Sequence, residues 1–481
     1  MRFAATMMNQ MLVPAALLFA LLGAAVPARA QPRVTVLRGT IVTPARVIED
    51  GTIAIVDATI GAVREASPRS AEAAIEVGGI IFPGLVDLHN HITWNAWPRW
   101  TPPAKTKNRY EWQEMPEYAA ALSDPHTDLV NSGYNCDLNR YGELKAIVNG
   151  ATSTVGSIPN ECIRGLARNL DFLSELRPKM AVGEEAFRNE VFPFEIRSSC
   201  GEQALRDVGR PLEDCALNAG ESRAAPPRAV VAHVGEGVDA SARREFSMFV
   251  AHGYLRAGNN IIHGVGLRAG QFAQMAASGV GLIWSPRSNI ELYGQTTDVA
   301  TARAAGVTVA IAPDWSPSGS SGMLAEIAYA DRWQRDPKNG IAVPFTSKEL
   351  FEMATSIPAR LARLDDRIGR LAPGSAADLI VMRRPAANAP AYDALVRQTP
   401  ADLLLVVVGG AAVFGEPALM RRLVTDPSRL EEIRVCGQPR LINARAGSYY
   451  AATPWAETAS RLSGALAPYG ITLAEFVECT P

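Results

Sequence analysis

The amino-acid sequence predicts an α/β protein: a (β/α)8 TIM-type barrel with a small β-sandwich domain built from both ends of the chain. In the central part, short apolar runs that end in polar clusters alternate with helical or loop stretches. This alternation is typical of parallel strands that are buried on both faces. The strand–helix units extend over about 250 residues, the usual length of such a barrel. Strand-like runs broken by turns lie on both sides of it.

The first 30 residues have the pattern of a secretory signal peptide. Arg2 is followed by a long apolar run and by the small-x-small sequence ARA. An uncleaved membrane anchor is the alternative, but the apolar run is short and is interrupted by Pro14. We therefore expect an exported, periplasmic or secreted protein, without membrane contact once the signal is removed.

The rest of the chain divides into four predicted segments. Residues 31–81 and 367–425 would form the two parts of the β-sandwich, residues 82–366 the barrel and residues 426–481 a C-terminal extension. Within the first part, Asp50-Gly51 is a typical hairpin turn. The third and fourth barrel strands have no clear sequence signal.

The charge of the chain excludes some classes of partner. Removal of the first 30 residues takes away two arginines and no acid, so the formal charge changes from −2 to −4. This mild acidity argues against nucleic acid or an anionic membrane surface as a partner, and leaves a small molecule as the expected ligand. The sequence leaves the oligomeric state open.

The six cysteines indicate disulfide bonds. An even number in an exported chain favours disulfides over free thiols, and the absence of a C-x-x-C pair argues against structural zinc. Of the 15 ways to pair six cysteines, the sequence-local one joins Cys136 to Cys162, Cys200 to Cys215 and Cys436 to Cys479.

Residues 82–94, FPGLVDLHNHITW, contain the first candidate site. If this stretch is a strand, His89 and His91 point to the same face, about 6–7 Å apart, and can bind one metal ion. An H-x-H pair alone is weak evidence, because surface histidines occur in the same pattern.

Further polar residues end the strand-like runs that follow. They are His233, with Glu236 three residues later, then His263 and Asp314. Each has an ordinary structural explanation: His263 as a buried core histidine, for example, and Asp314 as a helix N-cap. In a barrel, however, the carboxyl ends of all strands meet at one mouth, so these side chains are expected to converge. The two remaining histidines, His126 and His252, are expected to be structural.

Six ordered stretches of the sequence resemble the amidohydrolase superfamily, in particular its cytosine deaminase, guanine deaminase and triazine hydrolase branch. They are FPGLVDLHNH, VVAHVGEG, IIHGVGL, WSPRSNIELYG, AGVTVAIAPDWSPSGSSGML and GRLAPGSAADLIVM. Within this superfamily, the exported members have the most similar sequence after the H-x-H pair, where aromatic residues are followed by Asn108-Arg109-Tyr110.

The resemblance implies a metal centre and its chemistry. His89, His91, His233 and Asp314 would bind one divalent metal ion, Zn²⁺ before Fe²⁺ or Mn²⁺, because imidazole and carboxylate suit these ions. The metal would provide hydroxide at neutral pH. Asp314 would take up its proton, His263 would orient the hydroxide or the substrate, and Glu236 would protonate the leaving nitrogen.

We therefore expect a metal-dependent hydrolase that acts on a C–N bond, as an amidohydrolase or as an aminohydrolase (deaminase). The alternatives are a two-metal, peptidase-like amidohydrolase with a carboxylated Lys179, and a non-hydrolytic metal-binding barrel. Trp94, Trp97 and Arg287 are candidate substrate contacts. The tryptophans are equally compatible with packing of a loop over the barrel, and Arg287 with pairing to a neighbouring acid.

Overall fold

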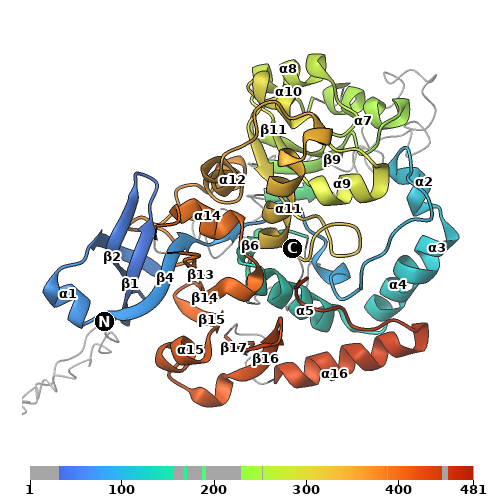
Figure 1. Cartoon of the computed structure of the whole chain (residues 1–481). Coiled ribbons are helices and arrows are strands. Elements are labelled where there is room, and N and C mark those ends of the chain that lie inside the picture. Colours follow the sequence, from blue (N-terminus) through green and yellow to red (C-terminus); the bar gives the residue numbers. More distant parts are fainter. Residues whose placement is uncertain are drawn as a thin grey trace, which may run out of the picture.

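The computed structural model describes residues 32–156, 166–170, 187–190, 229–251, 253–386, 388–446 and 453–479 (Figure 1). The predicted signal peptide, Lys179 and His252 lie outside these ranges. None of the helices among the described residues combines the length and the apolar character needed to cross a membrane.

Eight parallel strands form the central part of the molecule. One sheet has the order β12-β11-β10-β9-β8 and a second the order β5-β6-β7. The strands are β5 (Leu85–Val86), β6 (Ala151–Thr154), β7 (Arg168–Asn169), β8 (Phe187–Glu190), β9 (Ala229–Val234), β10 (Asn259–His263), β11 (Gly281–Trp284) and β12 (Val309–Ile311). An isolated parallel bridge between Asn90 and Asp314 joins the sheets. Order and direction are those expected for a (β/α)8 barrel, whose complete closure stays a prediction.

Strands β7 and β8 lie in the segment where the sequence gave no strand signal. β7 has only two residues, and both are polar. Periodicity cannot identify a strand of this length, whereas the wholly buried apolar residues of β9 make it visible in the sequence.

Helices cover the parallel strands. Those that follow β5 are α2 (Arg109–Gln113), α3 (Pro116–Tyr118), the π-helix η2 (Ala119–Ser123), α4 (Asp124–Asn131) and α5 (Asn135–Val148). Those that follow β9 to β12 are α7 (Ala240–Ala251), α8 (Ala269–Ser278), α9 (Pro286–Tyr293), α10 (Val299–Ala304), α11 (Met323–Arg335), α12 (Ser347–Met353) and α13 (Ser356–Leu361).

Both ends of the chain contribute to one mixed sheet, on the other side of the molecule from α7 and α8 in Figure 1. Its order is β16 (Glu431–Val435), β17 (Gln438–Ile442), β15 (Ala411–Gly415), β14 (Leu403–Val408), β13 (Leu379–Arg383), β4 (Ile75–Pro83), β1 (Val34–Val42), β2 (Val47–Val56) and β3 (Thr59–Glu65). Early and late strands meet where β4 pairs with β13 in antiparallel direction. Helices α1 (Pro68–Glu72), α14 (Ala391–Val396) and α15 (Pro417–Leu423) connect strands of this sheet.

One expectation about this domain was wrong, and another stays a prediction. The described strands form one continuous nine-stranded sheet, because β4 is hydrogen-bonded to β1 on one side and to β13 on the other. Apolar side chains of β1, β2, β14 and β15 belong to one buried cluster, and the two facing layers of a sandwich stay a prediction. Asp50-Gly51 is not a turn but part of β2, where Gly51 pairs with Gly39. The turn between β2 and β3 lies at Asp57, which has a positive φ of 51°.

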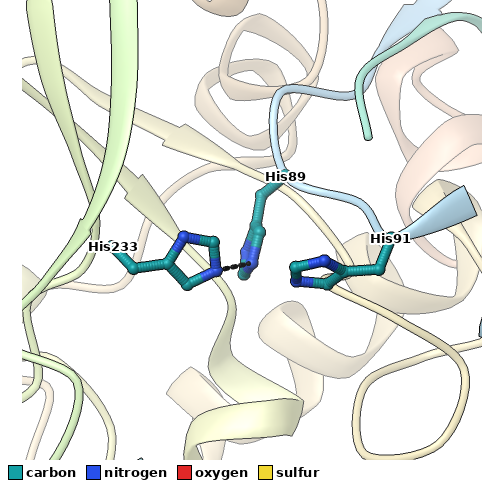
Figure 2. A group of neighbouring side chains, drawn as sticks. All are labelled: His89, His91 and His233. Atoms are coloured by element: carbon teal, nitrogen blue, oxygen red, sulfur yellow. Dashed lines mark hydrogen bonds between the residues drawn. The ribbon is translucent and has the colours of Figure 1, made fainter. Parts of the chain in front are cut away.

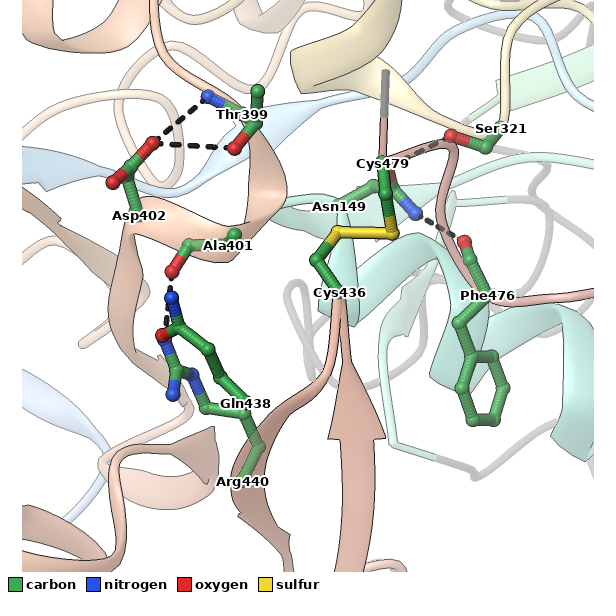
Figure 3. Close-up of a disulfide and its surroundings, with 10 residues drawn as sticks. All are labelled: Asn149, Ser321, Thr399, Ala401, Asp402, Cys436, Gln438, Arg440, Phe476 and Cys479. Carbon is green, nitrogen blue, oxygen red and sulfur yellow. Dashed lines mark hydrogen bonds between the residues drawn. A yellow bond between two sulfur atoms is a disulfide. The ribbon is translucent and has the colours of Figure 1, made fainter.

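The C-terminal segment is part of the fold. Strands β16 and β17 come from the predicted extension and join the sheet, and helix α16 (Trp455–Leu466) follows. The predicted disulfide between Cys436 and Cys479 is confirmed, and it holds the end of the chain against the start of this extension (Figure 3). Cys136 is disulfide-bonded as well. The other two predicted pairs include positions outside the described residues.

Phe82 tests how far the packing between the sheet and the helices stabilises the protein. It lies in β4, is fully buried and contacts Phe351 of α12, with 5.7 Å between ring centroids. We expect Phe82→Ala to lower the free energy of unfolding by about 3–5 kcal/mol, because it leaves a cavity that the paired strands cannot close. Chemical denaturation measures this, with Val343→Ala, at an exposed position, as the control. Equal stability of both variants would contradict it.

Candidate metal centre

The candidate ligands lie where strands end. His89 and His91 follow β5, His233 lies near the end of β9, and Asp314 follows β12. His263, the last residue of β10, and Asp314 both have φ near 67–68°. Residues other than glycine rarely adopt this left-handed conformation, and those that do occur in turns and cluster at functional sites. The turn that it makes directs each side chain at its strand end.

Three imidazole nitrogens and one carboxylate oxygen converge. His89 Nε2 lies 3.1 Å from His233 Nε2 and 3.1 Å from Asp314 Oδ1. His91 Nε2 lies 3.3 Å from the same oxygen. Figure 2 shows the three rings with their nitrogens directed at a common point. His89 and His233 are buried, whereas the side chain of His91 is 15% exposed.

This donor set fits a divalent cation. Ligands about 2.0–2.1 Å from a tetrahedral zinc ion lie about 3.3 Å from one another, close to the separations here. A hydrogen on His89 Nε2 cannot form a good hydrogen bond to both His233 and Asp314 at once, whereas a cation accepts all the lone pairs. His263 and Glu236 extend the group, since one ligand atom each from His233, Glu236 and His263 also lie within 4.8 Å of one another.

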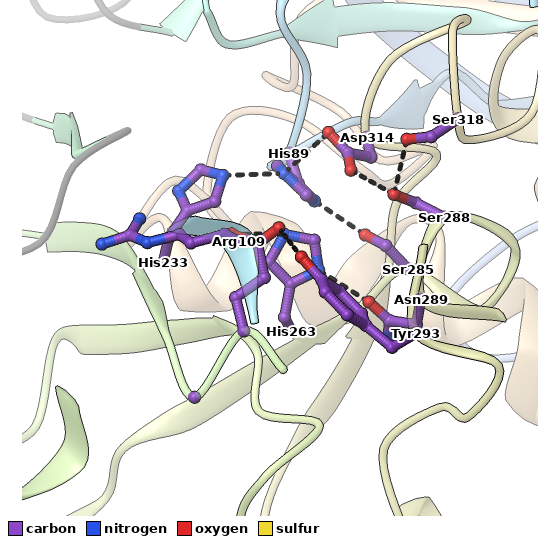
Figure 4. Close-up of polar contacts among 12 residues, drawn as sticks. His89, Arg109, His233, His263, Ser285, Ser288, Asn289, Tyr293, Asp314 and Ser318 are labelled. Carbon is purple, nitrogen blue, oxygen red and sulfur yellow. Dashed lines mark hydrogen bonds and ion pairs between the residues drawn. The ribbon is translucent and has the colours of Figure 1, made fainter. Parts of the chain in front are cut away.

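Neighbouring hydroxyl and amide groups orient these side chains. His89 Nδ1 lies 2.7 Å from Ser285 Oγ, and His263 Nδ1 lies 2.8 Å from Asn289 Oδ1. Ser288 donates to Asp314 Oδ2 at 2.6 Å (Figure 4). With one ring nitrogen occupied in this way, the other nitrogen of each histidine faces the centre. Such outer partners fix the tautomer and the ring orientation.

The ionisation of the buried groups also suits a cation. Burial lowers the pKa of His89 to about 4 and that of His233 well below the usual value, so both rings are neutral at pH 7. Burial by itself would raise the pKa of Asp314, but the charges and hydrogen bonds of His89 and His91 outweigh it and hold that pKa well below its usual range. Neutral imidazole and ionised carboxylate are the forms that bind metals.

Glu236 is held rigidly, although it lies between two glycines. The Tyr293 hydroxyl donates to its Oε1 at 2.7 Å, and its Oε2 lies 3.7 Å from His263 Nε2. The buried Glu245 accepts hydrogen bonds from the backbone N–H groups of Gly235, at 2.7 Å, and of Glu236, at 3.3 Å. The backbone and the carboxylate of Glu236 are therefore both fixed.

A second pair of groups anchors Glu245 in turn. Its Oε1 accepts a hydrogen bond from the Tyr110 hydroxyl at 2.8 Å and lies 3.1 Å from Arg109 Nε. Both residues belong to α2, so the segment after β5 helps to support the loop after β9. The sequence analysis noted Arg109-Tyr110 as a motif but predicted no role for it.

The chain is similar to known proteins. Residues 229–413 match the model of the amidohydrolase family. A 5-methylthioadenosine/S-adenosylhomocysteine deaminase of Halobacterium salinarum is 23% identical over 72% of this chain and 82% of its own length. The enzyme of the same name from Symbiobacterium thermophilum is 25% identical over 76% and 88%. The chain is thus similar to the amidohydrolase family, over residues 229–413 by the family model and over most of its length by these two relatives.

Solved structures show the same fold. A triazine hydrolase variant superimposes with a TM-score of 0.57 and 19% identity, over 79% of this chain and 94% of its own. Escherichia coli guanine deaminase gives 0.57 and 17%, over 79% and 99%. An atrazine chlorohydrolase from Arthrobacter aurescens, in complex with zinc and atraton, gives 0.56 and 18%, over 79% and 95%. These neighbours support the prediction of a barrel with an additional domain in this chain.

The three predicted substrate contacts, Trp94, Trp97 and Arg287, have different surroundings in the structure. The Trp94 ring stacks on His126, with 3.7 Å between ring centroids, and Trp97 is fully buried. Arg287 pairs with Glu478 of the C-terminal tail. The two tryptophans are therefore packed and Arg287 is paired with an acid, as the alternative interpretation of these residues expected. Their role in substrate binding stays a prediction.

The sequence analysis missed an aromatic group beside the centre. Trp315 directly follows Asp314, and its ring centroid lies 5.7 Å from that of His91. Trp112 and Tyr118 pack against Trp315, at 5.9 and 6.4 Å between centroids. The position of Trp315 next to a predicted ligand was a usable signal. Trp112 and Tyr118 gave none, since only the fold brings their helices to this place.

Metal analysis tests the centre directly. We expect the chelator-treated protein to take up one equivalent of Zn²⁺. We expect His91→Ala to lower its zinc affinity by more than ~100-fold, because losing a ligand weakens metal binding more than losing a residue that only orients a ligand. His126→Ala is the matched control, because His126 is also buried and hydrogen-bonded, to Thr93, but is not part of the group. Titration with a competing chelator measures both. Equal zinc affinity of the two variants would contradict the site.

Proposed function

We propose that this amidohydrolase is a zinc-dependent aminohydrolase that removes an amino group from a ring carbon of a small heterocycle. The observation that carries the proposal is the buried Glu236 carboxylate next to His263 and to the four convergent donors. A hydrolase that releases ammonia needs an activated water and a proton for the leaving nitrogen, and this arrangement provides a group for each. The deaminase names of the sequence relatives support it.

Each step is assigned to a residue of this chain. His89, His91, His233 and Asp314 would hold the zinc ion, which as a Lewis acid makes water nucleophilic at neutral pH. Asp314 takes up the proton of the attacking water. His263, fixed by Asn289, orients the atoms at the reacting carbon. Glu236 delivers a proton to the departing nitrogen.

The Tyr293 hydroxyl prepares Glu236 for this role. It donates to one carboxylate oxygen, while Trp112 Nε1 donates to the tyrosine oxygen at 2.9 Å. The tyrosine hydroxyl is thus engaged on both sides, and the second oxygen of Glu236 is the one directed at His263. A substrate placed beside His263 and Glu236 would meet an oriented carboxyl group.

The proposal also covers the barrel and the location of the protein. We infer a closed eight-stranded barrel and an enzyme that acts outside the cytoplasm, after removal of residues 1–30. The Cys436–Cys479 disulfide supports the location, because disulfides persist mainly in oxidising compartments.

Asp314→Asn separates catalysis from binding. We expect this variant to keep much of the zinc, since three histidines remain, and to lose turnover, because an amide cannot take up the proton of the attacking water. A non-hydrolytic binding protein would keep its ligand affinity after the same change. The zinc content separates the two mechanisms. One equivalent of zinc per chain supports the one-metal mechanism. Two equivalents, together with a loss of turnover in Lys179→Ala, would support the two-metal alternative.

A substrate screen with Glu236→Gln tests the reaction. We expect ammonia release from one or more aminated heterocycles, and a kcat lower by about 10²–10⁴-fold in Glu236→Gln at unchanged zinc content. Glu432→Gln, at an exposed position of β16, is the control. The screen includes cyclic amides and N-acyl amino acids. Ring opening or acyl transfer without ammonia release would contradict deamination but leave an amide hydrolase.

A further inference from the structure

A cavity lies outside the group of candidate metal ligands. It has a volume of about 630 Å³ and is lined by one face of α11, the segment that follows α14, and the C-terminal tail. None of the candidate metal ligands lines it. Its charged side chains are Arg99, Arg287, Arg332, Arg397, Asp331 and Glu478. Four guanidinium groups and two carboxylates therefore surround this space.

The sequence of α11 creates the hollow. Ala325, Ala328, Tyr329 and Arg332 follow one another at intervals of three, one and three residues, so they share one helix face. All four line the cavity. The small side chains of the two alanines leave room at this helix face, and Tyr329, Arg332 and Thr399 line the same space.

The carboxylates of the cavity are already engaged by arginines. Glu478 Oε1 lies 2.7 Å from Arg99 Nη2, and Glu478 Oε2 contacts Arg287. Asp331 Oδ1 lies 2.8 Å from Arg335, which is not among the cavity residues, and Asp331 Oδ2 lies 3.7 Å from Arg397. Asp393, outside the cavity lining, also pairs with Arg397, with 3.1 Å between Oδ2 and Nη1. Five arginines therefore face three carboxylates in these pairs and at Arg332, and the cavity keeps a positive surplus.

Arg332 carries this surplus most clearly. Within the described part of the chain its side chain forms no hydrogen bond or ion pair. Its charge affects the Tyr329 hydroxyl. Burial is the largest cause that raises the pKa of Tyr329, and the positive charges of Arg287 and Arg332 oppose that rise. The guanidinium of Arg287 also lies 5.7 Å from the centroid of the Tyr329 ring. An aromatic face and two guanidinium groups are therefore close together.

We propose that this cavity is a binding site for a small organic dianion, namely a phosphate monoester or dicarboxylate with an apolar or aromatic body. A concave surface with a surplus of one charge concentrates ions of the opposite sign, and arginine binds carboxylate and phosphate through paired N–H groups. The volume is within the usual range for ligand sites, about 300–1,000 Å³. Ala325, Ala328 and Tyr329 offer contacts for the body of the ligand.

Calorimetric titration of the full-length chain at constant ionic strength tests the site. The probes are phenyl phosphate, phthalate and the neutral benzyl alcohol, each with zinc-loaded and with chelator-treated protein. We expect at least one of the two dianions to bind equally well in both forms, and benzyl alcohol not to bind. Whichever dianion binds more tightly identifies the phosphate or the carboxylate class. Binding that disappears with the zinc would place the ligand at the metal centre and overturn the proposal.

Variants locate the binding. We expect Arg332→Gln to weaken binding of the dianion about 10-fold, the cost of one charged hydrogen bond. Ala328→Leu, which fills the space without changing the charge, should weaken it as well. Arg360→Gln, at an exposed position of α13 outside the cavity, should change it less than 2-fold. Absence of dianion binding, or equal binding by all three variants, would overturn the site, and neither result bears on the proposed deaminase activity.

Discussion

The site depends on one constraint: the lone pair of His89 Nε2 lies 3.1 Å from both His233 Nε2 and Asp314 Oδ1. Atoms that only accept hydrogen bonds repel one another at such distances unless a proton or a cation lies between them. Burial makes protonation costly here, since it lowers the pKa of both rings. A divalent cation removes the repulsion of all four donors together. Its binding free energy would then also stabilise the folded state.

The scaffold holds this arrangement through strain and through hydrogen bonds. His263 and Asp314 adopt positive φ at the ends of β10 and β12, at a cost of about 1–3 kcal/mol each. Gly156, after β6, lies so close to the carbonyl group of Asn90 that a Cβ atom would be 1.9 Å from its oxygen, which only glycine permits. The strand ends are thus shaped by their backbone as well as by their side chains.

The ligand group could be predicted because its members follow a local rule. Each comes at the end of a short apolar run, and parallel strands bring such ends together. The support of Glu236 could not be predicted in the same way. Glu245 lies in α7 and Tyr293 at the end of α9, and both reach Glu236 only through the packing of helices against the barrel. The two-residue strand β7 shows the same limit for the fold, because so short an element has no periodicity.

The C-terminal tail links the sheet domain to the loops around the site. The local sequence pattern of the tail does not predict this link. Arg99 donates to the backbone carbonyl groups of Ser318 and Gly319, at 3.2 and 2.7 Å, while it pairs with Glu478. The Ser318 hydroxyl lies 2.8 Å from that of Ser288, which donates to Asp314. A continuous series of contacts thus runs from the tail to a candidate ligand. Because Cys479 is bonded to Cys436 at the end of β16, the sheet domain fixes the tail, and through it the loop that follows Asp314. The part of the chain that looked like an appended extension is therefore one of the supports of the metal centre.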